Sequence, residues 1–452
     1  MNHPVLLDQP SSVRPDFAVY AARRARLMAQ MGANSLALIP TSDAKVRNRD
    51  ADYRFRPDSS FYYLTGFAEP EAVAVLEPSG DQPYVLFCRK RDREREIWDG
   101  LRAGTEGAVS QFGADAAFEI SDLDAQMIAR ISGKKRLYVR MGQDAAFDQK
   151  VTFWLNKVAA QQRNGGKVPL EIIQLDHLID EMRLIKDEHE IKLMQRAAQI
   201  SAAGHVRAMQ TVHAGMMEYA LEAELLYVFQ KNGCQTAYNS IVGGGVNACI
   251  LHYTENNQPL RDGDLVLIDA GAELDCYAAD ITRTFPVNGH FSPEQKALYE
   301  LVLKAQLAAI ELVRVGQHSK AYHEVAVRVL TEGLVELGLL AGDVDELIEN
   351  GSYRRFYMHG TGHWLGMDVH DVGSYKDEDG EAWRPLKAGM VLTVEPGLYV
   401  AADDDTVEPR WRGIGIRIED DVLVTEDDPI ILTADVPKTV AEIEALMQGA
   451  HV

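Results

Sequence analysis

Five residues in the C-terminal half of the chain constrain its fold more than any other feature, because four of them are acids set in apolar runs. Asp269 lies in LVLIDAG, Asp280 in AADITRTF, His363 in HGTGHWLG, Glu395 in VLTVEPGLY and Glu419 in GIGIRIEDD. An ionised carboxylate among buried apolar neighbours is costly unless a cation or hydrogen-bond donors compensate it. Four carboxylates and one imidazole suit a pair of divalent metals such as Mn, Co, Fe or Zn.

A short internal echo links two of these acids. The segment RDGDLVLIDAG (261–271) aligns with KAGMVLTVEPG (387–397) at a constant offset of 126 residues, and seven of the eleven positions match in kind. Asp269 then falls opposite Glu395. Chance could produce so short an echo, because strand-then-turn segments share a pattern of aliphatics and Gly. We interpret it as a duplicated unit whose halves face each other and supply carboxylates to a shared metal pair.

Length and composition predict a globular protein of two domains. A chain of 452 residues is too long for one ordinary core, and its contents of 46% hydrophobic and 25% charged residues are typical of soluble proteins. The formal net charge of −22 argues against a nucleic-acid backbone or an anionic membrane as partner. No apolar run approaches the ~20 residues that a membrane span needs.

The cysteines and the N-terminus favour a cytoplasmic location. The four cysteines show neither CxxC spacing nor the density of a disulfide scaffold, so we expect free thiols. The first residues, MNHPVLLDQPSSVRPDF, lack a basic segment followed by an apolar one, so no secretory signal is expected.

A domain boundary is expected between residues 183 and 184. Residues 1–183 alternate helical and strand patterns, which predicts an α/β domain. Asp187 and Glu190 then form a capping-box pattern at the start of a long helix, which is expected to run through His213. A second pattern at Ser292 starts a helix that is expected to end near Gly316. We expect residues 184–452 to form an α+β catalytic domain, because all five acid and imidazole candidates lie there.

The N-terminal domain is expected to shape substrate access and oligomerisation, with no chemistry of its own. Its charged run RKRDREREIW (89–98) predicts a solvated segment that ends on Trp98. Two interpretations of Trp98 stay open. It could form an aromatic wall at the substrate entrance, across a subunit interface, or it could pack inside its own domain.

Taken together, the motifs resemble those of the aminopeptidase P family, which is a family of pita-bread metallopeptidases. The resemblance rests on ILHYTEN, LIDAG, ADITRTFPV, HGTGHWLGMDVHDVG, TVEPGLY and GIGIRIEDD, and on YRFRPDSSFYYLTGFAEPEAV (53–73) in the N-terminal half. It implies a pita-bread catalytic domain preceded by the α/β domain.

The resemblance also implies a ligand set for two divalent metals, with Mn²⁺ expected first and Co²⁺, Fe²⁺ or Zn²⁺ as alternatives. Asp280 and Glu419 would bridge the two metals, Asp269 would complete one site, and His363 with Glu395 the other. A bridging hydroxide would then attack the Xaa-Pro bond. The competing interpretation is that these acids form buried ion pairs with Arg283 and Arg417.

Other residues gain roles from the same resemblance. His252 and His370 would deliver a proton to the leaving secondary amine and stabilise the oxyanion, while His359 would assist them or orient its loop. Glu395 would also accept the proton of water. Arg417 and Tyr399 would fix the ligand carboxylates, although Tyr399 could simply pack in the core. Gly362 departs from the Ser that the family usually shows.

The function implied is removal of an N-terminal residue that precedes proline, by a homo-oligomer (dimer or tetramer) acting on peptides. One alternative is a prolidase restricted to Xaa-Pro dipeptides. An alternative of another class is a non-catalytic pita-bread module that binds peptides, and the intact ligand set weighs against it. Metal analysis and products from dipeptides and tripeptides would separate these functions.

Overall fold

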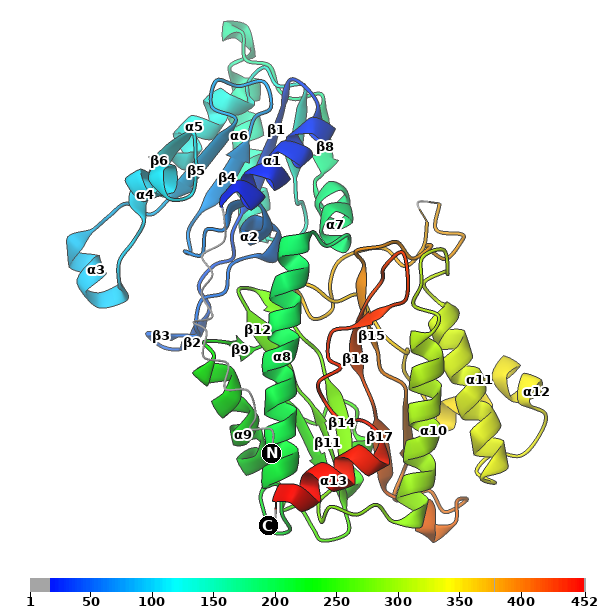
Figure 1. Ribbon diagram of the computed structural model, residues 1–452. Helices are drawn as coiled ribbons and strands as arrows, with labels where there is room; N and C mark the ends of the chain where they lie inside the picture. The colour runs from blue at the N-terminus through cyan, green and yellow to red at the C-terminus, as the bar shows by residue number, and fades with distance from the viewer. Residues whose placement is uncertain (1–16, 378, 451–452) are drawn as a thin grey trace. The chain divides into compact units, whose positions relative to one another are not determined.

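The computed structural model describes residues 17–377 and 379–450, and it divides into two compact units (Figure 1). One unit runs up to Arg183 and the other begins at Leu184. The expected absence of a secretory signal concerns the first residues, of which 1–16 lie outside the described part. Among the described residues, no helix combines the length and the apolar character that crossing a bilayer requires.

The N-terminal unit is built on a six-stranded mixed sheet in the order β6-β5-β4-β1-β7-β8. Strand β1 runs parallel to β7 and antiparallel to β4, and its position in the middle explains why nearly all of it is buried. The strands are β1 (Ser35–Pro40), β4 (Val73–Leu76), β5 (Tyr84–Cys88), β6 (Ala116–Glu119), β7 (Arg136–Val139) and β8 (Glu171–Gln174), with a separate hairpin of β2 (Val46–Asn48) and β3 (Ala51–Asp52).

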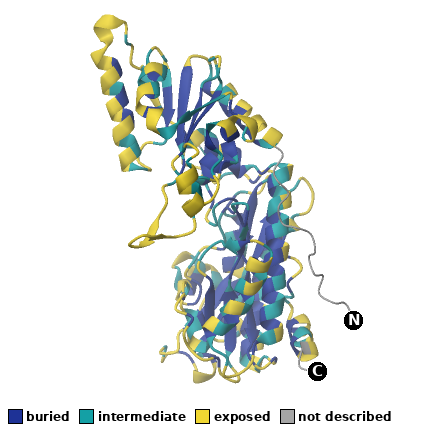
Figure 2. Ribbon diagram, turned by 90° about the vertical axis from the view of Figure 1, so that its left-hand side faces the viewer, coloured by how far each residue is buried: buried dark blue, intermediate teal, exposed yellow. Residues whose placement is uncertain are grey.

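Helices cover this sheet, and the alternation of side chains along β1 decides which helices each face meets. Leu36 and Leu38 pack in one core cluster with Trp154 and other residues of α5 and α6. Figure 2 shows the buried sheet with exposed helix surfaces outside it. The helices are α1 (Phe17–Met31), α2 (Ser59–Thr65), α3 (Arg93–Asp99), α4 (Gly104–Ser110), α5 (Leu123–Ile131), α6 (Ala145–Ala160) and α7 (Asp176–Leu184).

The C-terminal unit places short strands between two pairs of helices, α8 with α9 and α10 with α11 (Figure 1). The helices are α8 (Glu188–Thr211), α9 (Glu218–Lys231), α10 (Pro293–Ile310), α11 (Ala321–Glu336), α12 (Val344–Glu349) and α13 (Val440–Ala450). The strands are β9 (Gln235–Thr236), β10 (Ile241–Gly244), β11 (Leu265–Asp269), β12 (Ala272–Leu274), β13 (Tyr277–Ala278), β14 (Thr282–Pro286), β15 (Val391–Val394), β16 (Gly397–Val400), β17 (Ile414–Arg417), β18 (Asp420–Leu423) and β19 (Ile430–Ile431).

Two antiparallel strand pairs occupy corresponding places in the internal echo. Strand β11 pairs with β14, so that Asp269 lies opposite Thr282. Strand β15 pairs with β18, so that Val394 lies opposite Asp420. In the first pair, Asp269 ends β11 and Asp280 lies just before β14. In the second pair, Glu395 follows β15 and Glu419 lies just before β18. This arrangement brings acids that are far apart in sequence to the same ends of the strands.

The predicted helix starts are confirmed, and two helix ends differ from the prediction. Capping boxes are present at Asp187 and at Ser292. Helix α8 ends at Thr211, shortly before His213. Helix α10 ends at Ile310. The amides of Leu312 and Val313 bond to carbonyl oxygens three positions back, which tightens the chain after the helix and ends the α-helical pattern before Gly316.

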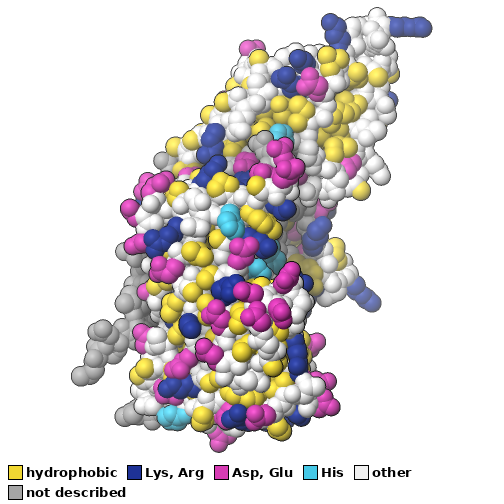
Figure 3. Space-filling model, turned by 90° about the vertical axis from the view of Figure 1, so that its right-hand side faces the viewer, with side chains coloured by type: hydrophobic (Ala, Val, Ile, Leu, Met, Phe, Trp, Pro, Cys, Tyr) yellow, Lys and Arg dark blue, Asp and Glu magenta, His cyan; other side chains and the backbone are white. Residues whose placement is uncertain are grey.

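Trp98 lies on the surface of its own unit. Its side chain is 84% exposed, and helix α3, which carries it, has no buried residue. The alternative in which Trp98 packs inside its own domain is therefore wrong. Elsewhere on the surface, acidic side chains are spread over the face shown in Figure 3 with basic side chains among them. The negative net charge is thus not gathered into one patch on that face.

Candidate metal centre

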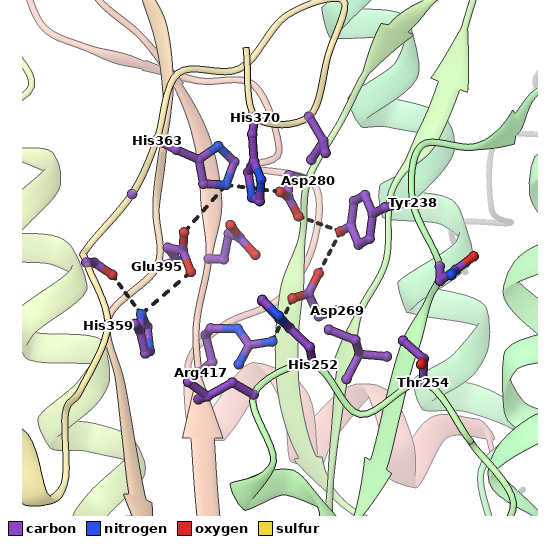
Figure 4. Close-up of a pocket in the computed structure, with 17 residues that line it drawn as sticks. Tyr238, His252, Thr254, Asp269, Asp280, His359, His363, His370, Glu395 and Arg417 are labelled. Carbon is purple, nitrogen blue, oxygen red and sulfur yellow. Dashed lines mark hydrogen bonds and ion pairs between the residues drawn. The ribbon is translucent and has the colours of Figure 1, made fainter. Parts of the chain in front are cut away.

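A pocket of about 370 Å³ in the C-terminal unit brings together most of the predicted site residues (Figure 4). Its lining includes the five predicted metal ligands, three further histidines and one arginine: Asp269, Asp280, His363, Glu395, Glu419, His252, His359, His370 and Arg417. Tyr399 lies behind this lining, and Trp98 belongs to the other unit. The strand ends described above supply the four carboxylates, and loops supply the imidazoles.

The two ring nitrogens of His363 have different surroundings. Nδ1 lies 3.1 Å from the carbonyl oxygen of Trp364 and donates to it. Nε2 faces the carboxylates, 3.5 Å from Asp280 Oδ2 and 3.6 Å from Glu395 Oε1. A backbone acceptor at one nitrogen fixes the tautomer and leaves the other nitrogen for a metal. Ligand atoms of Asp280, His363 and Glu419 all lie within 4.8 Å of one another, a spacing that could hold one ion.

Few positive charges compensate the carboxylates of this pocket. Arg417 lies 2.6 Å from Asp269, a buried ion pair. Arg283 instead pairs with Asp420 at 2.7 Å. The interpretation in which Arg283 and Arg417 both form ion pairs with the site acids therefore holds for Asp269 alone. Glu419 accepts a hydrogen bond of 2.6 Å from the Thr282 hydroxyl. Asp269 thus has a guanidinium partner, Asp280 and Glu395 face the His363 imidazole, and Glu419 has a neutral hydroxyl donor.

Burial and the neighbouring charges together set the pKa values of the cluster. Burial raises the pKa of Glu395 to about 7. Burial and the neighbouring carboxylates of Asp280 and Glu395 raise the pKa of Glu419 well above its usual range. Burial disfavours the charged form of His363, yet the Asp280 carboxylate outweighs it and raises the pKa to about 9. Raised pKa values at three groups mean that the site favours added positive charge, which divalent cations would supply. With the cations bound, His363 would be neutral, as a metal ligand must be.

A chain of hydrogen bonds links Arg417 to His359. Arg417 Nη1 donates to the Tyr399 hydroxyl at 2.9 Å, and that hydroxyl donates to His359 Nε2 at 2.9 Å. His359 Nδ1 donates to the Gly360 carbonyl oxygen at 2.7 Å and lies 3.9 Å from Glu395 Oε2. Burial and the Arg417 charge lower the pKa of His359 to about 3, so this imidazole stays neutral. Tyr399 is buried, and its hydroxyl hydrogen-bonds two site residues. It therefore packs in the core and also contacts site side chains, the two roles considered for it.

The remaining histidines approach the carboxylates from other segments (Figure 4). The His370 ring is 4.3 Å from the His363 ring and nearly perpendicular to it. Burial and the charge of His363 lower the pKa of His370. His252 lines the pocket and is exposed. Both are placed to meet a molecule that enters the pocket.

Two residues that hydrogen-bond the site acids were not predicted from the sequence. The hydroxyl of Tyr238 lies 2.6 Å from Asp269 and also hydrogen-bonds Asp280, although it has one proton to donate. Thr282 holds Glu419 as described above. Neither residue stands in a local pattern that marks it, because each meets its acid through tertiary folding. The position of Gly362 has a steric reason, since a Cβ atom there would lie 1.8 Å from the carbonyl oxygen of Thr393.

Comparisons with known proteins identify the family of this chain. Residues 192–426 match the model of metallopeptidase family M24, and residues 20–138 match that of the aminopeptidase P N-terminal domain. The chain is 47% identical to the Xaa-Pro aminopeptidase of Haemophilus influenzae, covering 95% of this chain and 96% of that protein. It is 46% identical to the Xaa-Pro aminopeptidase of Escherichia coli, covering 96% and 98%.

Solved structures agree as well. A structure of a Pseudomonas aeruginosa aminopeptidase superposes with a TM-score of 0.96 at 55% identity, covering 97% of this chain and 100% of that one. A substrate complex of Escherichia coli aminopeptidase P gives a TM-score of 0.93 at 45% identity, covering 97% and 99%. The α+β class, with a pita-bread domain after an α/β N-terminal domain, is confirmed. The chain belongs to metallopeptidase family M24 and, within it, to the aminopeptidase P group.

Proposed function

We propose that this protein is a metal-dependent aminopeptidase that releases the N-terminal residue from peptides with proline in the second position. The observation that carries the proposal is a single pocket in which four carboxylates and His363 are surrounded by three more imidazoles. Membership of the aminopeptidase P group supports the enzyme class, and the match to its N-terminal domain favours an aminopeptidase over a prolidase. A non-catalytic peptide-binding module would have no need of so costly a buried acidic cluster.

Two divalent cations fit the donor set. Asp280 and Glu419 would contact both, Asp269 would complete one site, and His363 with Glu395 the other. Carboxylate oxygens with a single imidazole suit Mn²⁺, and Co²⁺, Fe²⁺ or Zn²⁺ are the alternatives. When bound, the cations would lower the pKa of water and polarise the scissile carbonyl group.

The side chains of the protein itself would transfer the protons of the reaction and orient the other site residues. Glu395 would also accept the proton of the attacking water, since its carboxylate lies 3.6 Å from the His363 imidazole and 3.9 Å from that of His359. An Xaa-Pro bond expels a secondary amine, which has to be protonated as it leaves. His370 and His252 would supply that proton and stabilise the oxyanion. His359, a neutral imidazole beside Glu395, would assist them or orient its loop through the bond from Nδ1 to the Gly360 carbonyl oxygen. Arg417 and Tyr399 would keep Asp269 and His359 in place.

The N-terminal unit would control access and assembly in a cytoplasmic homo-oligomer, a dimer or tetramer. Trp98 and the neighbouring Ile97 and Leu101 are 84%, 76% and 84% exposed, an apolar group that association would cover. In this proposal Trp98 forms an aromatic wall at the substrate entrance, across a subunit interface. The four cysteines are free thiols, which supports a reducing compartment.

A comparison of substrates tests the reaction. Purified, Mn²⁺-loaded protein is incubated with Xaa-Pro-Yaa tripeptides and with matched Xaa-Ala-Yaa tripeptides, and the free N-terminal residue is measured. The proposal expects release from the proline peptides alone or in large excess. Equal release from both peptides would assign a general aminopeptidase, and absence of release with full metal content would assign a binding module.

A further inference from the structure

A buried ion pair joins the beginning of the C-terminal unit to the loop that carries His370. Lys186 Nζ lies 2.9 Å from Asp371 Oδ2, and each side chain is 1% exposed. The two residues are 185 positions apart, and Asp371 immediately follows His370. Buried ion pairs are weak evidence for stability, because desolvation offsets much of their attraction. The placement of this pair next to His370 therefore suggests a role in the site.

The loop from His363 to Asp371 is folded around the Asp371 side chain. The Asp371 amide donates to the Trp364 carbonyl oxygen at 2.9 Å, which closes the loop. Asp371 Oδ1 lies 3.4 Å from the amide of Asp368, at the long limit for a hydrogen bond. Gly366 lies directly against the carboxylate, since a Cβ atom there would be 2.1 Å from Asp371 Oδ2. The carboxylate is thus enclosed by its own loop on one side and by Lys186 on the other.

Lys186 is itself held firmly. It directly precedes Asp187, the N-cap of α8, and its amide donates to the Gly389 carbonyl oxygen at 2.8 Å. Gly389 has φ +90° and its amide donates to the Val424 carbonyl oxygen at 3.0 Å, which ties the turn before β15 to β18. The backbone of Lys186 is therefore fixed between the capped start of α8 and the strands β15 and β18, which limits where its ammonium group can lie.

His370 depends on its backbone for direction. In the described part of the chain its ring takes part in no hydrogen bond of its own, and its one ring contact is with His363. The neighbouring Asp371 is fixed through both its amide and its carboxylate. Whatever fixes Asp371 consequently limits where the His370 imidazole can point.

We propose that Lys186 is a positioning residue for the peptidase reaction: through Asp371, it holds the loop that presents His370 to the substrate. The inference rests on the proposed function, in which His370 transfers a proton. A misplaced catalytic group can cost roughly 100-fold in rate, so the contribution of His370 should depend on Lys186 although Lys186 bonds to the neighbouring Asp371.

A double-mutant cycle between Lys186→Met and His370→Ala tests the dependence. Met keeps the length of the side chain without its charge. Lys186→Met is expected to lower kcat by roughly 10–100-fold with two metals retained, and the penalty of His370→Ala should shrink by the same factor in that background. Lys134→Met, which removes the ion pair with Glu77 in the other unit, is the matched control and should leave the His370→Ala penalty unchanged. Additive effects in the Lys186 cycle would overturn the inference.

A second variant separates position from folding. Lys186→Met leaves the buried Asp371 carboxylate uncompensated, so the Lys186→Met/Asp371→Asn double variant removes that charge too. We expect its thermal midpoint to return toward that of the unmodified protein while kcat stays low. Recovery of both would show that the pair only supports the fold, and would overturn the inference. Failure of the proposed function is distinguishable, because the unmodified protein would then release nothing from Xaa-Pro peptides, and both proposals would fall.

Discussion

Arg417 and Asp269 form a buried ion pair, 2.6 Å between Nη2 and Oδ2, although 148 residues separate them in the sequence. The pair gives the acidic cluster its closest guanidinium. Its position means that Asp269 has a permanent charged partner, whereas Asp280, Glu395 and Glu419 depend on neutral donors, on His363 or on bound cations. That imbalance determines how the site should respond to substitution.

Replacing Glu419 should disturb both metal sites together. Glu419→Gln removes a proposed bridging carboxylate, so we expect metal content to fall from two ions per chain and the rate to fall with it. Atomic emission on dialysed protein measures the metal. Glu426→Gln, an exposed acid in the same unit, is the control. If Glu419→Gln kept two metals and the full rate, the bridging role would be abandoned.

Replacing His370 should affect the reaction far more than metal binding. General acid–base groups contribute ~10²–10⁴-fold, so His370→Ala is expected to lower kcat by a factor in that range with metal content preserved. The exposed His213→Ala is the control, measured in the same steady-state assay. A normal kcat in His370→Ala would assign this histidine a structural role.

Removal of the Tyr399 hydroxyl should cost both stability and rate. Tyr399→Phe leaves Arg417 Nη1 and His359 Nε2 without a partner, and we expect a loss of about 1–3 kcal/mol in the free energy of unfolding. The rate should fall roughly 10–100-fold, as for other residues that orient ligands. Tyr299→Phe is matched, because its buried hydroxyl donates to the Lys438 carbonyl away from the pocket. It should lose stability alone, and equal rate losses in the two variants would contradict the role of Tyr399.

Stability should fall in mild acid because of His205. Burial lowers the pKa of this fully buried imidazole from 6.5 to about 4, while Nε2 donates to the Ala270 carbonyl oxygen at 2.9 Å. Below pH 6.5 the unfolded chain takes up a proton that the folded chain refuses, so the free energy of unfolding decreases as the pH drops. The contribution should be about 2 kcal/mol between pH 7 and pH 5.

Urea unfolding of the unmodified protein and of His205→Leu at both pH values isolates this contribution. The variant should be less stable at pH 7, because it lacks the hydrogen bond to Ala270, and should lose less stability on acidification. The same pH dependence in both proteins would rule out His205 as its source.

Trp98→Ala should weaken assembly without destabilising the fold. Surface substitutions usually change the free energy of unfolding by less than ~0.5 kcal/mol, and Trp98 is 84% exposed. Sedimentation velocity should show a smaller oligomer, and discrimination between peptide lengths should decrease. Phe153→Ala, also exposed, is the control. Unchanged assembly and unchanged length preference in Trp98→Ala would contradict the proposed entrance role.

Much of the fold could be predicted from local pattern. The capping boxes at Asp187 and Ser292 mark helix starts by a pairing of side chain and backbone within four residues, so sequence alone locates them. The acids could be singled out because an ionised carboxylate beside a buried apolar strand needs a cation or hydrogen-bond donors to compensate it. Helix ends such as that of α10 depended on turn geometry that no residue type marks.

The parts that could not be predicted depend on tertiary contacts. Tyr238 reaches Asp269 and Asp280 from a different segment, and nothing in its neighbours signals that contact. Lys186 looks like one more surface lysine before a helix, yet it is buried on Asp371. Long-range polar partners of this kind become visible only once the strands and loops are assembled.

The most direct test of the central claim is product analysis on Xaa-Pro dipeptides and Xaa-Pro-Yaa tripeptides side by side, each with and without a chelator. The account predicts that the tripeptides release their first residue, that chelation abolishes the release and that Mn²⁺ restores it. Cleavage of dipeptides alone would contradict it in favour of a prolidase. Release that persists at full rate after the metal has been removed would contradict the metal-dependent mechanism itself.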